Sequence, residues 1–238
     1  MIEWARSSDP LALALLKQHP LVHHAEFGPA TGIEFAVGTW DRSVRIGTHE
    51  LYGITEFMDN NPMVCADSIG LPSPSVHLSL LALSPILDSG LVVDSPALII
   101  SEAIDEDELA FGLSQCGWTQ GCAVAVEPMA LNGVIAATTM IAIRTPSDPA
   151  EIDEIYEERF GRSFYVRPST DAWSSDLVRC TPYALYRTSL ALETGTSLLT
   201  VKSMADRRGK LGPTGWIHAM NVMANFEESV GIPDQLPD

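Results

Sequence analysis

The residues best suited to chemistry lie near the carboxyl end of the chain, in a basic turn between a strand and a helix. An apolar strand is expected over residues 197–201, and a helix is expected to begin at about Thr214. Between them stand Arg207, Arg208 and Lys210. A helix start offers free backbone N–H groups and the positive end of the helix dipole, and Arg and Lys add fixed charge. The turn is therefore a candidate anion site. The alternative is a solvated turn whose bases pair with surface carboxylates.

Two serines and a histidine could supply the reacting groups. Ser73 and Ser75 stand where a loop is expected to enter a helix over residues 75–87, so a serine hydroxyl could attack a carbonyl while helix N–H groups stabilise the oxyanion. His218 follows Lys210 by eight residues in the last helix, and its pKa range suits general acid–base catalysis. The alternatives are an N-cap for Ser73, a first-turn position for Ser75 and a structural role for His218.

A metal site has weaker support. His23 or His24 could combine with His49 and with Glu26 or Glu34. Adjacent residues of a strand point to opposite faces, so only one of the two neighbouring histidines could take part, and no spacing fixes the set. We therefore expect no metal.

The four cysteines, Cys65, Cys116, Cys122 and Cys180, show no CxxC spacing. Cys116 and Cys122 could form a disulfide or a metal pair, but reduced thiols in a cytoplasmic protein are expected.

The 238-residue chain is strongly acidic, with 14 Lys and Arg against 31 Asp and Glu and a formal net charge of −17. Such a surface repels phosphate backbones and anionic lipid, so neither a nucleic-acid nor a membrane partner is expected. No apolar run reaches the roughly 18 residues that span a bilayer. A small anionic metabolite remains compatible, because screening weakens a diffuse field more than a local cluster of cations.

Several elements can be read from capping residues and hydrophobic periodicity. Asp9 is expected to cap a short helix over residues 10–16. Asp41-Arg42 is expected to form a hairpin turn, and residues 63–66 a short apolar strand. The acidic run 94–108 is expected to be a solvated loop and helix start.

Four motifs in sequence order carry a resemblance to a known family. They are Ser79-Leu-Leu-Ala-Leu-Ser-Pro-Ile-Leu87; Pro128-Met129 with Asn132-Gly133; the helix 151–160 followed by Phe164-Tyr-Val-Arg167; and Asp206-x-x-x-Lys210 followed by Met220-Asn-Val-Met223. From about residue 62 to residue 226 the chain resembles the catalytic and dimerisation half of the N-acetyl-glutamyl-phosphate reductase and aspartate-semialdehyde dehydrogenase group.

The resemblance implies an α+β fold, with a mixed sheet covered on one face by helices, like the C-terminal domain of glyceraldehyde-phosphate-dehydrogenase-like proteins. Residues 1–60 would form a helix and a small β-rich extension, and residues 61–238 the α+β domain. The resemblance also places Asp206, Lys210 and Asn132 at substrate-binding positions. Because sheet faces in that group meet across subunits, a homo-oligomer is expected.

The chain departs from the family at positions that the family uses for catalysis. Pro74 stands where the family has its nucleophilic Cys, residues 102–120 contain no His for the catalytic position, and Asn132 replaces an Arg. No G-x-G-x-x-G turn precedes the matched region, so the backbone could not approach a dinucleotide pyrophosphate there. No cofactor is therefore expected.

Three functions are compatible with these residues. The first is a cofactor-independent enzyme, of hydrolase or deaminase type, acting on a small carboxylated or phosphorylated metabolite. The second is a non-catalytic relative that binds a ligand or stabilises a partner. The third is an NADP-linked reductase component that uses a dinucleotide site elsewhere in an assembly.

Overall fold

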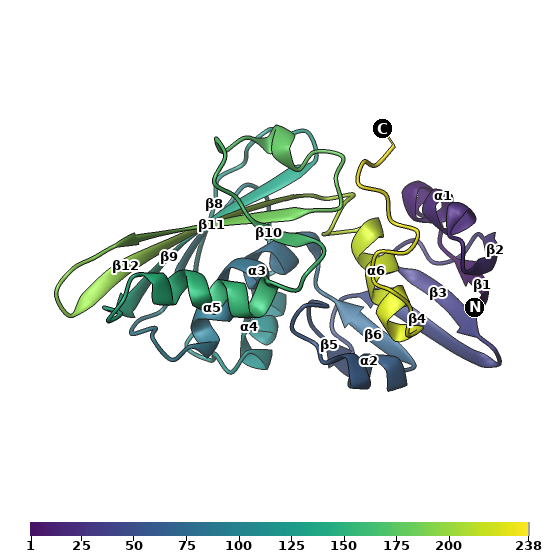
Figure 1. The fold of residues 1–238 in the computed structure, drawn as a ribbon, viewed down its shortest axis with the longest axis horizontal. Helices are drawn as coiled ribbons and strands as arrows, with labels where there is room; N and C mark the ends of the chain where they lie inside the picture. The colour runs from purple at the N-terminus through teal and green to yellow at the C-terminus, as the bar shows by residue number, and fades with distance from the viewer. Residues whose placement is uncertain (238) are drawn as a thin grey trace.

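The computed structural model describes residues 1–237 and contains two six-stranded sheets (Figure 1). The first sheet has the strand order β2-β1-β3-β4-β6-β5 and mixes parallel with antiparallel pairs. Its strands are β1 (Ile2–Arg6), β2 (Val22–Glu26), β3 (Ile33–Val37), β4 (Trp40–Ile46), β5 (Leu51–Tyr52) and β6 (Ser68–Leu71).

The chain opens with a βαβ unit, because β1 and β2 are parallel and joined through α1 (Pro10–Gln18). The prediction of Asp9 as N-cap is confirmed: its Oδ1 accepts a hydrogen bond from the backbone N–H of Ala12 at 2.9 Å. The expected order, a helix followed by strands, did not include β1, which precedes α1. The sheet also includes β6, which lies beyond residue 60, so the division of the chain at that residue stays a prediction.

One buried helix covers the centre of the first sheet. Every residue of α6 (Pro213–Met223) is buried, and the helix packs on β3 and β4 between α1 and α2 (Asn60–Cys65). Ile217 and Met220 contribute to a core with Phe35 of the sheet and Leu16 of α1. The carboxyl end of the chain therefore completes the amino-terminal half.

The second sheet has the order β10-β11-β12-β9-β7-β8, and its long central pair is β9 against β12. Its strands are β7 (Ala97–Ile100), β8 (Ala123–Val126), β9 (Val134–Arg144), β10 (Val166–Pro168), β11 (Ala184–Ala191) and β12 (Thr196–Asp206). Alternate residues of β9 are buried, which is the period of a strand with one covered face.

Helices cover one face of this sheet: α3 (Pro74–Asp88), α4 (Glu106–Gln115) and α5 (Ala150–Phe160) all lie below it in Figure 1. On the opposite, outer face, part of the segment 169–183, with the short helix η1 (Ser175–Leu177), packs against Ala136 and Met204. The expected α+β architecture, with a mixed sheet covered on one face by helices, is confirmed.

Two local expectations are wrong. The hairpin between β3 and β4 turns at Gly38-Thr39, where Gly38 adopts a φ of 62° that favours glycine, so Arg42 lies within β4. Residues 63–66 do not form a strand, because residues up to Cys65 belong to α2, which carries Pro62 in its first turn.

Candidate functional site

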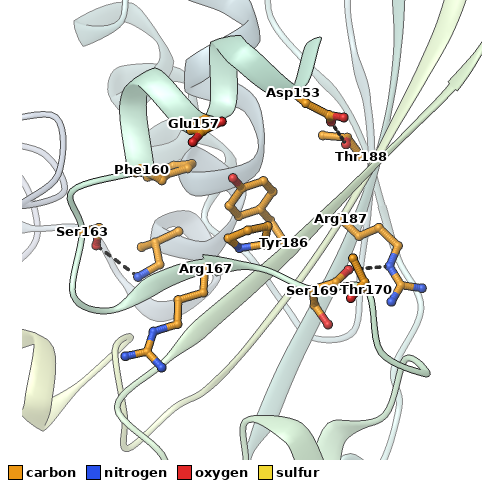
Figure 2. A pocket seen from close by; sticks show the side chains of 13 residues that line it. Asp153, Glu157, Phe160, Ser163, Arg167, Ser169, Thr170, Tyr186, Arg187 and Thr188 are labelled. Carbon is orange, nitrogen blue, oxygen red and sulfur yellow. Dashed lines mark hydrogen bonds between the residues drawn. The ribbon is translucent and has the colours of Figure 1, made fainter. Parts of the chain in front are cut away.

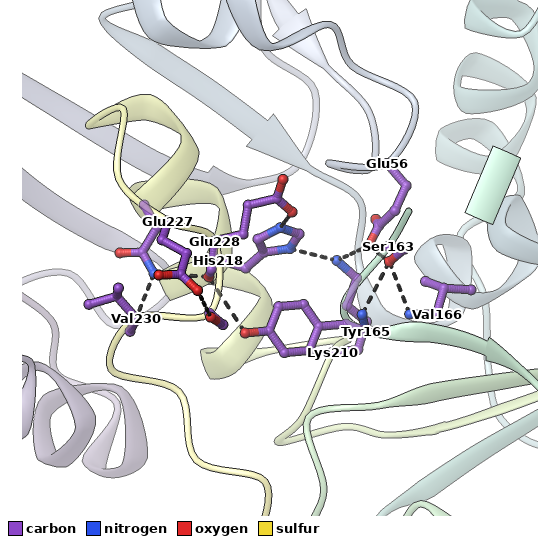
Figure 3. A network of polar contacts seen from close by, with 11 residues as sticks. Glu56, Ser163, Tyr165, Val166, Lys210, His218, Glu227, Glu228 and Val230 are labelled. Atoms are coloured by element: carbon purple, nitrogen blue, oxygen red, sulfur yellow. Dashed lines mark hydrogen bonds and ion pairs between the residues drawn. The ribbon is translucent and has the colours of Figure 1, made fainter. Parts of the chain in front are cut away.

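The structure brings two of the candidate residues, Lys210 and His218, together in a buried polar network (Figure 3). The Lys210 ammonium lies 2.7 Å from Oε1 of Glu56 and 3.1 Å from Nδ1 of His218. The side chains of Lys210 and Glu56 are only 1% and 4% exposed. Since an ammonium can only donate, the His218 Nδ1 accepts.

The network continues to the segment that follows α6. His218 Nε2 lies 2.7 Å from Oε2 of Glu228, to which its N–H donates. The Tyr165 ring packs edge-on against the imidazole, with ring centroids 4.9 Å apart. Ser163 donates its hydroxyl to Glu56 at 3.1 Å. We call Glu56, Lys210, His218 and Glu228 the buried network.

Charge pairing holds the network in one protonation state. Burial, the largest single effect, would raise the pKa of Glu56, but the charge and hydrogen bond of Lys210 together with the neighbouring histidines lower that pKa to about 2. Burial and the same ammonium lower the pKa of His218, which keeps its imidazole neutral. The ionised pair Glu56–Lys210 is therefore flanked by a neutral histidine.

His77 of α3 borders the network and is also buried. Its Nε2 and the Oε2 of Glu56 have no hydrogen-bond partner within residues 1–237. Burial, together with Lys210, lowers the pKa of His77 to about 3. The ring is therefore neutral in the folded protein throughout the physiological range.

The lowered pKa of His77 predicts a loss of stability in mild acid. The unfolded chain binds a proton at His77 near pH 6.5, whereas the folded chain does so only near pH 3, so stability is full above about pH 6.5 and falls between those values. His77→Phe should reduce the slope of unfolding free energy against pH by about 1 kcal/mol per unit between pH 6 and 4. Urea unfolding at several pH values measures the slope. An unchanged slope would show that His77 is already protonated or solvated when folded.

A second group forms at the amino-terminal end of α3. The Ser75 hydroxyl lies 2.7 Å from Oε1 of Glu102 and 2.9 Å from the carbonyl oxygen of Ala103, both of which can accept from it. Arg207 forms an ion pair with Oε2 of the same Glu102. The backbone N–H of Arg207 also donates to Gly133, which places the exposed Asn132, at φ 51°, beside this group.

Ser73 occupies the N-cap position of α3, but its side chain forms no capping hydrogen bond. Its hydroxyl donates to Oε2 of Glu108 at 2.5 Å, and the Tyr52 hydroxyl donates to Oε1 at 3.0 Å. Glu108 and Glu102 both lie in the acidic run. Two of its carboxylates thus bind the candidate serines instead of being simply solvated, although the predicted helix start is confirmed: α4 begins in this run, with Asp105 as its N-cap.

The three cations of the basic turn do not meet in one recess, which corrects the expected single anion site. Lys210 points into the buried network, Arg207 pairs with Glu102, and Arg208 donates to the carbonyl oxygen of Pro237 at 2.8 Å. Asp206 is buried, and its carboxylate accepts from the backbone N–H groups of Cys180 and Arg208, each at 2.7 Å. Asp206 therefore holds the shape of the turn, which sends each cation in a different direction.

Sequence reasoning missed Glu56, Glu102, Glu108 and Glu228, the four carboxylates that bind the candidate residues. Nothing in their local sequence separates them from the other acidic residues of the chain. Their contact with a base or a serine is the signal, and that contact exists only in the folded chain.

The residues considered for a metal, a dinucleotide or a disulfide lie outside the buried network. Within residues 1–237 no group of three or more His, Cys, Asp or Glu side chains is placed to hold a metal, and the His23 and His24 rings pack edge-on at 4.2 Å. At the first βα turn, the Asp9 carboxylate occupies the helix start that receives a pyrophosphate in dinucleotide-binding domains. Cys116 and Cys122 are both free thiols. None of the helices described in residues 1–237 has the length and apolar character needed to cross a bilayer.

Among solved structures, the chain is similar to the crystal structure of aspartate semialdehyde dehydrogenase II complexed with ASA from Vibrio cholerae. The two share 10% sequence identity with a TM-score of 0.63, over 94% of this chain and 98% of that chain. No protein-family model matches the chain, and no curated protein matches it. At this identity the likeness shows the fold, and function must be argued from the site.

Proposed function

We propose that this chain is a non-catalytic relative of the semialdehyde dehydrogenases that acts by binding and stabilising a protein partner, first of all a second copy of itself. The observation that carries the proposal is the state of Lys210. The resemblance places this lysine near the substrate, yet its ammonium is neutralised inside the chain by Glu56 and is 1% exposed. A buried lysine whose ammonium is already paired with a carboxylate is not available to bind a substrate anion.

The environment of the α3 start supports the same conclusion. Pro74, at the position of the family nucleophile, has no reactive side chain. Ser73 and Ser75 on either side have their hydroxyls engaged by Glu108 and Glu102. The side chains that would do chemistry are instead used to hold α3, α4 and the basic turn together.

Ligand-dependent thermal stability tests this proposal. Succinate, citrate, inorganic phosphate and NADP should each leave the melting temperature unchanged, because Lys210 and Arg207 are paired with carboxylates and Arg208 is directed elsewhere. A melting temperature raised by succinate, citrate or phosphate would contradict the proposal and favour the small anionic metabolite as substrate. A rise with NADP alone would favour the reductase component.

The outer face of the second sheet is the surface we assign to self-association. Its β9 positions, which include Thr138, Met140 and Ala142, are only partly buried within one chain, and Leu198 on β12 is 44% exposed. A sheet face that is only partly covered within one chain is stabilised by packing against the same face of a second copy about a two-fold axis.

Met140→Glu should therefore convert a homodimer to a monomer, because it places a charge at the centre of that face next to Thr200. Phe27→Glu is the matched control, since Phe27 is 78% exposed in the first sheet region, outside this face. Light scattering coupled to size-exclusion chromatography measures the mass. A monomeric wild type, or a dimer that survives Met140→Glu, would refute the assignment.

A second candidate function rests on Ser75. Its hydroxyl is hydrogen-bonded to a carboxylate at a helix start, with Arg207 on the far oxygen of that carboxylate. This arrangement supports a cofactor-independent hydrolase or deaminase in which Glu102 activates Ser75, Arg207 binds the substrate anion, and His218 moves protons.

Hydrolysis of p-nitrophenyl acetate tests the second candidate. The control is Ser79→Ala, because Ser79 lies on the same helix and its hydroxyl donates to the backbone carbonyl oxygen of Ser75. Activity that is lost in Ser75→Ala and kept in Ser79→Ala would establish the second candidate function. Equal rates for the wild type and Ser75→Ala would leave the non-catalytic function as the better account.

A further inference from the structure

A pocket of about 780 Å³ lies between α5, the edge strand β10 and its neighbour β11 (Figure 2). Its floor is aromatic, formed by Phe160 and Tyr186 with ring centroids 5.4 Å apart. Tyr156 stacks beneath Tyr186 at 5.3 Å and is itself fully buried. The floor therefore offers aromatic side chains against which an apolar or cationic group can pack.

One wall of the pocket carries two carboxylates. Asp153 and Glu157 are four residues apart on α5, so they lie on the same side of the helix and both line the pocket. Asp153 accepts a hydrogen bond from the Thr188 hydroxyl at 2.7 Å, which fixes its position. The Glu157 carboxylate forms no hydrogen bond or ion pair with the residues described, 1–237.

The two arginines of the pocket do not neutralise this wall. Arg187 is tied to the opposite side by hydrogen bonds to the carbonyl oxygens of Ser169 and Asp171. The Arg167 guanidinium stacks 3.7 Å from the ring centre of Tyr183. In Figure 2 both guanidinium groups are directed away from α5. The pocket thus keeps negative charge beside an aromatic floor.

Two hydroxyl groups that line the pocket form no hydrogen bond with the residues described, 1–237. Ser169 is buried, and its Oγ has no hydrogen-bond partner within residues 1–237. The Tyr186 hydroxyl likewise forms no hydrogen bond in that part of the chain. Burial, with Asp153 and Glu157 adding to it, raises the pKa of Tyr186 to about 12, so this hydroxyl stays protonated and can donate.

We propose that this pocket binds a small organic cation, an ammonium or guanidinium group attached to an apolar body. The cation lies against Glu157 and Asp153, the apolar body covers Phe160 and Tyr186, and a polar substituent reaches Ser169. Charge-assisted hydrogen bonds to carboxylates and cation–π contact with tyrosine both favour this class of ligand. Ser163 lines the pocket and donates to Glu56, so the site adjoins the buried network, but the proposal does not depend on the proposed function.

Isothermal titration calorimetry with benzylammonium tests the proposal, with benzyl alcohol as the uncharged probe of the same shape. Benzylammonium is expected to bind, and benzyl alcohol to bind at least about tenfold more weakly, because only the former pairs with a carboxylate. Glu157→Gln should weaken benzylammonium binding by at least about tenfold. Glu154→Gln removes the same charge from an exposed position of α5 that does not line the pocket, and should change affinity less than about twofold.

Amide chemical shifts locate the ligand. Benzylammonium should shift the resonances of Gly161, Thr170 and Thr188, which line the pocket. Absence of binding at millimolar concentration, equal binding of benzyl alcohol, equal effects of the two glutamine variants, or shifts confined to another region would each overturn the proposal. Both substitutions are at exposed residues and preserve side-chain shape, so a folding defect is not expected to obscure the result.

Discussion

Lys210→Met is expected to destabilise the protein by about 3–5 kcal/mol and to lower its melting temperature by roughly 10 °C. The substitution keeps the length of the side chain but leaves Glu56 as an uncompensated buried carboxylate. Glu56 must then take up a proton, because the ammonium that lowers its pKa to about 2 is gone. Urea unfolding followed by circular dichroism measures the loss.

The double variant Glu56→Gln with Lys210→Met separates the charge effect from packing. Removing both charges should restore most of the lost stability, which gives a coupling free energy of about 2 kcal/mol or more. Lys17→Met is the control, because Lys17 is exposed in the last turn of α1 and should change stability by less than about 1 kcal/mol. If Lys210→Met behaves like Lys17→Met, the pair is solvated and the premise of the non-catalytic proposal fails.

Arg42→Met is expected to cost about 3 kcal/mol or more, because one guanidinium serves the carboxyl ends of two helices. Its Nη2 donates to the carbonyl oxygens of Met63 and Ala66 at 2.7 and 2.6 Å, and its Nη1 donates to that of Met223 at the end of α6. The guanidinium packs on Trp40, 4.2 Å from the ring centre. Methionine fills the space but leaves these carbonyl groups without a donor.

Arg42→Met should loosen α6 locally in addition to lowering the stability of the whole protein. Because Arg42 ties α6 to α2 and β4, amide hydrogen exchange should accelerate in α6 before it does so in the second sheet. Arg45→Met provides the control: Arg45 forms a half-exposed ion pair with Glu34 at 2.8 Å, and its loss should cost no more than about 1 kcal/mol. Equal destabilisation by the two variants would mean that the helix ends are satisfied by other groups.

The sequence predicted those parts of the fold that depend on neighbouring residues. Asp9 and Pro10 fixed the start of α1, Pro74 fixed the start of α3, and the alternation of apolar residues over 134–143 indicated β9. These signals work because a cap or a strand face is decided within a few residues along the chain. The hairpin placed at Asp41-Arg42 was wrong for the same kind of reason: the nearby Gly38 offered a better turn.

The amino-terminal half contains elements that local sequence patterns do not predict. Residues 2–6 form β1 because β2 and β3 pair with them on either side, and α6 arrives from the far end of the chain to bury the sheet. None of these partners is adjacent in sequence. The expectation of a helix and a small β-rich extension included neither β1 nor the helix α6 that packs on this sheet.

By itself the sequence determined the absence of a nucleophile at Pro74, the lack of a Gly-rich turn, the strong negative charge and the motifs that resemble the semialdehyde dehydrogenases. Only the tertiary structure decided which groups the three cations of the basic turn contact. With 31 acidic residues to choose from, nothing local distinguishes Glu56 as the partner of Lys210 or Glu102 as the partner of Arg207. The choice is made when α6 packs on the first sheet and the turn held by Asp206 directs one cation inward, since a charge removed from water is stable only beside its counter-ion.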